Sequence, residues 1–478
     1  MEYAHLKGNT MAKQVTLGEN KMGVMPVGKL LVNMALPMII AMLVQAFYNV
    51  VDSYFVSKIS DEESIRQSAI AAMSLSFAVQ NILIGTAAGL GVGVNALLSK
   101  SLGEGNQEKA NRTAGNGIVI AASAAVLFLL FGIFGTKTYF NMMSDTPLTV
   151  EYGTTYISII CFASIGVFIE VLCERLLQAS GRTVHSMITQ TTGAIINIIL
   201  DPCLIFGLGP FPRMGIAGAA IATVTGQWIA ALLALTFNLK FNSDVHFSFG
   251  YLKPRKDIIK SILVVGIPSI IMTSIGSIMN IGMNKVLAQF TQYGEMPITV
   301  FGIYFKLQSF FFMPLFGMNN ATISIVAYNY GARKPERITK TLKLACAAAL
   351  TFMLIGLALF QSVPDVLLSL FDDSDAFLAM GCGALRTISL SFPFAAICIA
   401  LGSSFQALGN GIYATFVSLC RQLIVLLPAA FLLSLSGNVN AVWWAFPIAD
   451  IGSVAATAFM FSRIYKQKIK PLFDAPRL

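Results

Sequence analysis

An apolar stretch at residues 193–207 carries an amide, a carboxylate and a proline within six positions. Asn197 and Asp201 are four residues apart, so on a helix they share one face. Pro202 has no N–H, and its ring displaces the carbonyl of Ile198, which leaves a backbone oxygen beside two side-chain oxygens. Such a donor set suits a hard cation such as Na⁺. A carboxylate at the centre of a bilayer costs roughly 2.5–3.5 kcal/mol on insertion scales, so it is kept where it pairs, binds a cation or takes up a proton.

A second carboxylate, Asp52, lies in the first long apolar run, three residues after Asn49. That spacing places both side chains on one side of a helix. Two other interpretations stay open from the residues alone: Asp201 could cap a helix end, and Asp52 could anchor the outer end of the first span. If the two acids lie close together, they favour a proton-linked switch, because neighbouring like charges do not ionise independently.

The composition indicates that these stretches cross a membrane. Of the 478 residues, 56% are hydrophobic and 12% are charged, and the mean hydropathy is +0.73. Soluble domains carry about 25% charged residues, and a soluble chain could not cover so much apolar surface. A polytopic membrane protein is therefore expected. The net charge of +9 does not indicate nucleic-acid binding, because the basic residues stand at the ends of apolar runs rather than among stacking aromatics.

Apolar segments long enough to span a bilayer number twelve, and they fall at 29–56, 68–99, 113–136, 152–178, 184–209, 214–238, 257–289, 298–329, 341–363, 381–407, 411–436 and 440–463. Assigning the connecting loops alternately to two sides puts 24 lysines and arginines on one side and 5 on the other. This positive-inside bias predicts that both termini lie in the cytoplasm.

The two halves of the chain resemble each other at a nearly constant offset. QASGRTVHSM (178–187) matches QALGNGIYAT (406–415) at an offset of 228 residues, and Gly89 matches Gly317 at the same offset. In the first spans Pro37 matches Pro268 at an offset of 231. Six spans per repeat give both repeats the same orientation, with a pseudo-two-fold axis along the membrane normal.

The predicted fold is therefore an all-α polytopic membrane protein with twelve transmembrane helices in two six-helix lobes. The expected divisions are a cytoplasmic tail, an N-lobe, a cytoplasmic linker, a C-lobe and a second cytoplasmic tail, at residues 1–28, 29–238, 239–256, 257–463 and 464–478.

Four stretches together carry a resemblance to a known family. They are MGVMPVGKLL (22–31), QAFYNVVDSYFV (45–56), INIILDPCLIFG (196–207) and GIAGAAIATVTGQ (215–227). The chain resembles the multidrug and toxic compound extrusion (MATE) family, in its bacterial DinF- and MepA-like branch, over essentially its whole length. The resemblance implies a two-lobed, twelve-helix exporter of cationic or amphipathic drugs in the bacterial inner membrane, driven by inward flow of H⁺ or Na⁺.

The resemblance also implies a coupling site in the N-lobe. The matching residues are Asp52, Asn197, Asp201 and Thr223, with a Na⁺ site at the first three as one use. Asn49 and Pro202 are expected to support this group.

Glu170 and Glu174 are four residues apart in the fourth span, beside Arg175. They form either a structural salt-bridge group, which is the favoured interpretation, or part of a cation path.

A polyspecific substrate cavity could draw on adaptable side chains in the seventh and eighth spans. The candidates are Met279, Met283, Lys306 and Phe310, with ordinary helix packing as the favoured alternative for the apolar ones.

The C-lobe lacks an equivalent coupling site. Asn280 and Asn284 stand where an acid could be sought, Ala429 matches Asp201, and Asp450 has no assigned role. Coupling is therefore expected in the N-lobe alone.

Three functions compete. The favoured one is a secondary antiporter that exports organic cations or amphipathic drugs in exchange for H⁺ or Na⁺. The alternatives are a flippase for a lipid-linked oligosaccharide or cell-wall precursor, and a channel or receptor. The flippase would need a basic cavity, for which only Lys306, Arg386 and Arg421 are available, and a channel does not explain the parallel repeats. No Walker motif is present, so ATP is not the expected energy source. We expect a monomer in the lipid bilayer that is not an enzyme, needs no cofactor and binds no nucleic acid.

Overall fold

The structure is a computed structural model that describes residues 20–56, 58–59 and 62–474. For residues 49, 50 and 53 it describes the backbone alone, so the predicted contribution of the Asn49 side chain lies outside the described residues. All regular elements within the described ranges are helical.

Twelve candidate spans confirm the predicted number. Ten helical segments among the described residues are long and apolar enough to cross a membrane, and two further spans are helix pairs bent by 50° and 43°. The spans of the first half are α2 (Val27–Val56), α3 (Glu63–Gly103), α4 (Gln107–Phe134), the bent pair α6 (Pro147–Phe162) and α7 (Ser164–Ala179), α8 (Thr183–Phe206) and α9 (Ile216–Phe241).

The second half repeats this order. Its spans are α10 (Lys256–Leu287), α11 (Met296–Gly331), α12 (Pro335–Ser362), the bent pair α14 (Asp375–Ser389) and α15 (Phe392–Ala407), α16 (Gly411–Leu419) continued through the π-turn η3 (Cys420–Ile424) into α17 (Leu426–Ser434), and α18 (Val439–Val442) with α19 (Ala445–Ile464), η4 (Tyr465–Ile469) and α20 (Lys470–Asp474). Short elements α1 (Lys21–Val24), α5 (Thr136–Met143), η1 (Phe249–Leu252), η2 (Thr291–Tyr293) and α13 (Pro364–Ser369) join them.

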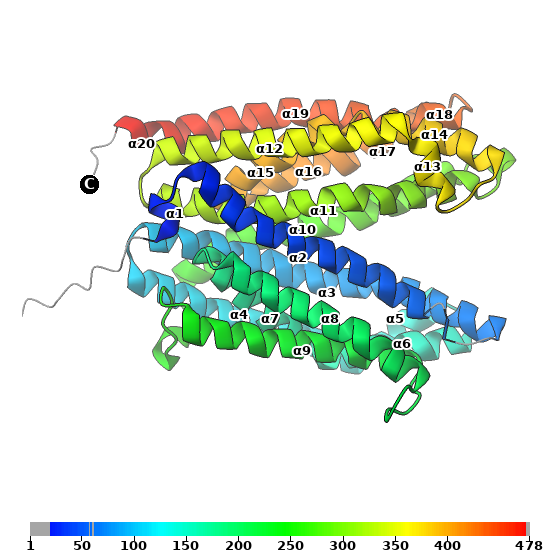
Figure 1. The fold of residues 1–478 in the computed structure, drawn as a ribbon, viewed down its shortest axis with the longest axis horizontal. Helices are drawn as coiled ribbons and strands as arrows, with labels where there is room; N and C mark the ends of the chain where they lie inside the picture. Colours follow the sequence, from blue (N-terminus) through cyan, green and yellow to red (C-terminus); the bar gives the residue numbers. More distant parts are fainter. Residues whose placement is uncertain (1–19, 57, 60–61, 475–478) are drawn as a thin grey trace, which may run out of the picture.

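The helices form two bundles, which we call the N-lobe (α2–α9) and the C-lobe (α10–α20) (Figure 1). Both α1 and α20 lie at one end of the molecule, called the terminal end below, and α13 and α18 lie at the other, called the far end (Figure 1). The helical structure extends into the tail expected at 464–478, because η4 and α20 continue the last span to Asp474.

Glycines at repeat-related positions let the two lobes approach closely. A Cβ added to Gly89 on α3 would lie 2.6 Å from the backbone nitrogen of Ile270 on α10. One added to Gly317 on α11 would lie 2.9 Å from the backbone nitrogen of Ile39 on α2. Gly89 and Gly317 are 228 residues apart, and Ile39 and Ile270 are 231 apart, so the two contacts are equivalent under the repeat. Close approach of backbones at small residues is typical of packed membrane helices.

The same symmetry holds at the terminal end. A Cβ on Gly103 would collide with the carbonyl oxygen of Tyr328, and one on Gly331 would collide with that of Lys100. Each residue of one pair is again 228 positions from its counterpart in the other. The last turns of α3 and α11 are thus in direct backbone contact across the pseudo-two-fold axis, and the terminal end is closed there.

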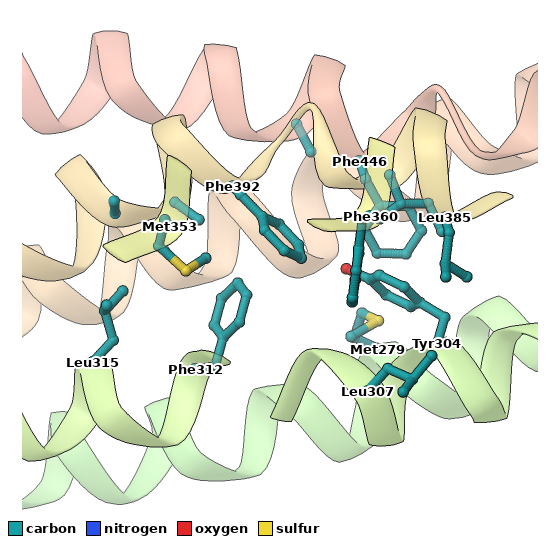
Figure 2. Packing of buried hydrophobic residues seen from close by; sticks show 14 of the residues in the cluster. Met279, Tyr304, Leu307, Phe312, Leu315, Met353, Phe360, Leu385, Phe392 and Phe446 are labelled. Carbon is teal, nitrogen blue, oxygen red and sulfur yellow. The ribbon is translucent and has the colours of Figure 1, made fainter. Parts of the chain in front are cut away.

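Helix α2 belongs to both lobes. Leu30, Met34 and Met38 in its first half are buried in the apolar core of the C-lobe, whereas its second half packs on α8 of the N-lobe. The C-lobe core is rich in aromatic rings, with Phe392 packed against Phe360 at 5.3 Å between ring centroids (Figure 2). One continuous helix therefore connects the C-lobe core to the site described next.

Candidate functional site

Helices α2 and α8 bring two carboxyl groups into contact. The side chains of Asp52 and Asp201 lie within hydrogen-bonding reach of each other, and they are 8% and 0% exposed. The Oδ1 atom of Asp52 has no hydrogen-bond partner among the described residues. Ionised carboxylates only accept hydrogen bonds, so this contact requires a proton or a cation between the two groups.

Asn197 and Thr223 complete the group predicted from the sequence. The Asn197 amide, with its nitrogen facing the carboxyl, donates to Oδ2 of Asp201 at 3.1 Å. Its oxygen then accepts from the backbone N–H of Thr223 at 3.0 Å and from the Thr223 hydroxyl at 3.2 Å. Pro202 follows Asp201 inside α8, which continues to Phe206. The structure thus brings Asp52, Asn197, Asp201 and Thr223 together from α2, α8 and α9.

Tyr48 is a site residue that the sequence reasoning missed. Its hydroxyl lies within hydrogen-bonding reach of Thr223, and the side chain is close enough to both aspartates to interact with their charges. Tyr48 precedes Asp52 by four residues, so the two side chains share a face of α2. The four-residue spacing of Tyr48 and Asp52 can be seen in the sequence, and it is the signal that could have identified Tyr48. A further phenol, Tyr156 on α6, lies nearby and accepts from Nε2 of Gln80 at 3.0 Å.

A cavity of about 720 Å³ adjoins this group. It lies among α2, α3, α7, α8 and α9 of the N-lobe, in the half of the bundle toward the far end, with Met313 of α11 as its contribution from the C-lobe. Its polar lining consists of Gln45, Tyr48, Asp52, Ser74, Gln80, Asn81, Glu170, Glu174, Gln190, Asn197, Thr223 and Gln227. Asp201 lies behind this wall, in contact with Asp52 and Asn197.

Glu170 and Glu174 form an acidic wall of the cavity. Glu174 is 6% exposed and accepts from the Thr189 hydroxyl at 3.1 Å. Arg175 does not form an ion pair with Glu174 within 4.0 Å; its Nη1 donates to Gln178 at 2.9 Å instead. Glu170 is half-buried and lines the cavity. Both glutamates therefore face the cavity, while the neighbouring guanidinium is held by an amide.

The C-lobe candidates for a substrate cavity lie elsewhere. Met279 and Met283 are 5% and 0% exposed in the C-lobe core, so the packing alternative describes them (Figure 2 shows Met279 among aromatic rings). The side chain of Lys306 is exposed, and Phe310 is 47% exposed. None of these four side chains lines the described cavity. Met313, one helical turn beyond Phe310, does.

Asp450, which the sequence left unassigned, has a charged partner. The Nε atom of Arg421 lies 3.5 Å from its Oδ1 atom, and Ser391 is within hydrogen-bonding reach of the carboxyl. Arg421 belongs to the π-turn η3 and also lies over the ring of Phe312 at 5.9 Å. The C-lobe therefore holds a paired acid and base, whereas the N-lobe site holds two acids in contact.

Twelve spans in two parallel repeats, with an acidic cavity inside the first repeat, define the class of two-lobed, multi-pass membrane transporters. Comparison with protein families agrees, because the family model named MatE matches this chain twice, at residues 37–203 and 268–432. The chain belongs to the MatE family. The two matches correspond to the two repeats.

Individual relatives are distant but similar over most of their length. The chain is 24% identical over 430 residues to the multidrug export protein MepA of Staphylococcus saprophyticus, covering 90% of this chain and 92% of that protein. It is 27% identical over 454 residues to a protein named FAD transporter from Shewanella oneidensis, covering 92% and 95%.

Solved structures share the fold. A MATE crystal structure in complex with MaL6 matches with a TM-score of 0.87 at 23% identity, covering 96% of this chain and all of that one. An outward-facing multidrug resistance MATE transporter matches with the same TM-score at 23% identity, covering 96% and 99%.

Proposed function

We propose that this protein is a secondary active antiporter that exports organic cations or amphipathic drugs in exchange for H⁺ or Na⁺. The observation that carries the proposal is the contact between Asp52 and Asp201 beside a cavity with two further acids. The acid pair needs a bound proton or cation to be stable, and it adjoins a cavity that can hold a small molecule. Such a site can exchange the bound ion for the cargo.

The charge of the cavity supports a cationic cargo. Asp52, Glu170 and Glu174 line it, and the nearby base Arg175 is engaged with Gln178. Carboxylates in a poorly solvated wall attract cations more strongly than they would in water. The relative from S. saprophyticus, which carries the name of a multidrug export protein, fits such a cargo.

Coupling is proposed to work by competition at the acid pair. When H⁺ or Na⁺ occupies the space between Asp52 and Asp201, the negative charge that holds the cargo falls and the cargo leaves. When the ion departs, the charge returns and cargo binds again. Because the other half of α2 lies in the C-lobe core, a change at Asp52 also acts on the lobe interface. Alternating access then moves the cavity from one side of the membrane to the other.

The membrane orientation follows from the loop charges. We propose that the terminal end faces the cytoplasm, because 24 of the basic residues lie on that side in the alternating assignment. The protein is then a monomer in the bacterial inner membrane, with the N-lobe at 29–238 and the C-lobe at 257–463, and acts without a bound cofactor other than the coupling ion.

A competing cargo class is a nucleotide cofactor, since the relative from S. oneidensis is named FAD transporter. An anionic pyrophosphate would face Glu170 and Glu174 in this cavity, which disfavours it. The flippase alternative meets the same obstacle, because Lys306 lies outside the cavity and Arg421 is paired with Asp450.

The test uses purified protein in liposomes, with a pH gradient or a Na⁺ gradient imposed separately. Ethidium, norfloxacin and FAD are the three probes, and flux is measured for the wild type and for Asp201→Asn. We expect gradient-driven flux of the cationic probe with one of the two ions, and its loss in Asp201→Asn. Flux of FAD alone would overturn the cationic assignment, and unchanged flux in Asp201→Asn would remove the acid pair from the mechanism.

A further inference from the structure

The short helix α1 is bound by the C-lobe. Two carbonyl groups around it, those of Met22 and Met25, accept from Nη2 of Arg337 at 2.9 and 2.8 Å. Asn329 also donates to the Met22 carbonyl, at 3.1 Å. Met22 itself is fully buried in the C-lobe core. The chain that leads into the first helix of the N-lobe is thus held by α11 and α12 of the other lobe.

The opposite side of α1 is bound by the N-lobe. Nδ2 of Asn20 donates to the carbonyl of Ser180 in the turn between α7 and α8, at 3.1 Å. Lys21 donates to Asn33 of α2 at 2.7 Å. Helix α1 therefore bridges the two lobes at the terminal end, as its position between the bundles indicates (Figure 1).

A second bridge involves the segment before α10. The side chain of Asn116 on α4 donates to the carbonyls of Tyr251 and Lys253 at 3.3 and 3.4 Å, and accepts from the backbone N–H of Arg255 at 2.8 Å. The guanidinium of Arg112 lies 5.9 Å from the Tyr251 ring centroid. The chain that leads into the first helix of the C-lobe is thus held by α4 of the N-lobe.

The two bridges are related by the internal repeat. Helices α4 and α12 begin and end 228 residues apart, and each is the third span of its lobe. Each binds the segment that precedes the first span of the other lobe. Both bridges lie at the terminal end, where Gly103 and Gly331 also bring α3 and α11 into contact, while the cavity lies in the opposite half.

We infer that these two bridges form a clasp that keeps the terminal end closed, and that Arg337 and Asn116 are the residues that hold it. The inference rests on the proposed alternating access, in which cargo must reach the cavity from the terminal side once in each cycle. Opening that side separates the lobes, so α1 must leave either Arg337 or Ser180, and the segment before α10 must move relative to Asn116. The clasp sets how much of the protein is open to the terminal side at rest.

The test measures lobe separation directly. Spin labels are placed at Glu108→Cys on α4 and Lys340→Cys on α12, in a chain whose seven native cysteines are replaced, and the label-to-label distance is recorded by pulsed electron resonance in nanodiscs without cargo. We expect Arg337→Gln and Asn116→Ala each to raise the open fraction roughly tenfold, which corresponds to the loss of about one charge-assisted or bidentate hydrogen bond.

The matched control is Arg333→Gln, which removes the same charge from an exposed side chain in the connection between α11 and α12. Arg337→Lys, which keeps the positive charge, is expected to fall between wild type and Arg337→Gln. If either Arg337→Gln or Asn116→Ala does not fold, the remaining variant still tests the clasp, because the two residues belong to different bridges. Distances that stay at the wild-type value in the folded variants overturn the clasp. Because no cargo or ion gradient is used, this outcome is independent of whether the flux assays support the proposed function.

Discussion

Asp52 on α2 and Asp201 on α8 are 149 residues apart in the sequence and touch through their carboxyl groups in the fold. Within the described part of the chain, neither carboxyl group forms an ion pair with a lysine or an arginine. The pair is therefore an arrangement that costs stability unless a proton or cation occupies it.

Replacing Asp201 by Asn should stabilise the protein while it abolishes coupled transport. An asparagine can donate to Asp52 and still accept from Asn197, so the contact no longer needs a bound proton or cation to be favourable. We expect a gain of about 1 kcal/mol, within the range of stabilising changes at strained functional sites. Thermal unfolding in detergent at neutral pH measures it. A midpoint below that of the wild type would contradict this account, and Asp372→Asn, at a fully exposed acid, is the control.

Thr223→Val should weaken ion coupling without disturbing the fold. Valine matches threonine in shape but cannot bond the side chains of Asn197 and Tyr48, whereas the backbone N–H of residue 223 still donates to Asn197. We expect the concentration of coupling ion needed for half-maximal flux to rise roughly tenfold, as for the loss of one buried hydrogen bond. Thr223→Ser keeps the hydroxyl and should behave as wild type. Equal behaviour of the valine and serine variants would show that the hydroxyl has no role.

Glu170→Gln should raise the KM for cationic cargo and leave neutral amphipathic cargo unaffected. Glu170 lines the cavity, and a change of this residue removes charge at nearly constant volume. A loss of roughly 1–2 kcal/mol in cargo affinity, or about tenfold in KM, is the expected scale for one partly screened charge. Competition binding with a cation and with a neutral analogue measures the effect of the variant on each type of cargo separately. Glu151→Gln, at an exposed acid on α6, is the control, and a parallel loss for both cargo types would contradict a charge-specific role.

Gly89→Ala and Gly317→Ala should destabilise the protein to a similar extent. In each case the new Cβ would meet a backbone nitrogen at less than 3.0 Å, so the facing helices must separate. Overpacking of this kind costs about 1–3 kcal/mol. Gly402→Ala on α15, where no atom lies within 4 Å of the new Cβ, is the control and should be neutral or slightly stabilising. Unequal effects of the two interface variants would indicate that the repeat-related contacts are not energetically equivalent.

Removing one member of the buried pair Arg421–Asp450 should cost about 3–5 kcal/mol, because the other charge is left without a partner. The double variant Arg421→Met with Asp450→Leu should recover most of that loss. A double-mutant cycle from thermal unfolding measures the coupling. Strictly additive effects would mean that the two groups do not stabilise each other.

Much of the fold could be predicted because the membrane simplifies the sequence. Long apolar segments, the loop charges and matches at one offset define twelve spans in two repeats, and the glycine pairs show that symmetry in the packing. Asp52, Asn197 and Asp201 could be singled out because polar residues in apolar helices are rare. Their grouping with Thr223 was implied by the family resemblance.

The sequence could not show which C-lobe side chains lie in the core, in a cavity or on the surface, because membrane helices are apolar on every face. Met279 and Met283 were not distinguishable in sequence from cavity residues such as Met313, since neither hydropathy nor spacing tells core from cavity. Lys306 could point inward or outward for the same reason. The pairing of Arg421 with Asp450 connects different helices and involves a π-turn that shifts side-chain directions, so no helical spacing rule predicts it.

The matched contacts of Gly89 with Ile270 and of Gly317 with Ile39 have a consequence for the surface between the lobes. Each lobe presents the same surface to the other, which is the isologous interface of a two-fold symmetric dimer, here made from one polypeptide. Such an interface is the one that two separate copies of a single repeat would make with each other. Separately synthesised halves, divided in the loop between α9 and η1, retain the surfaces needed to reassemble.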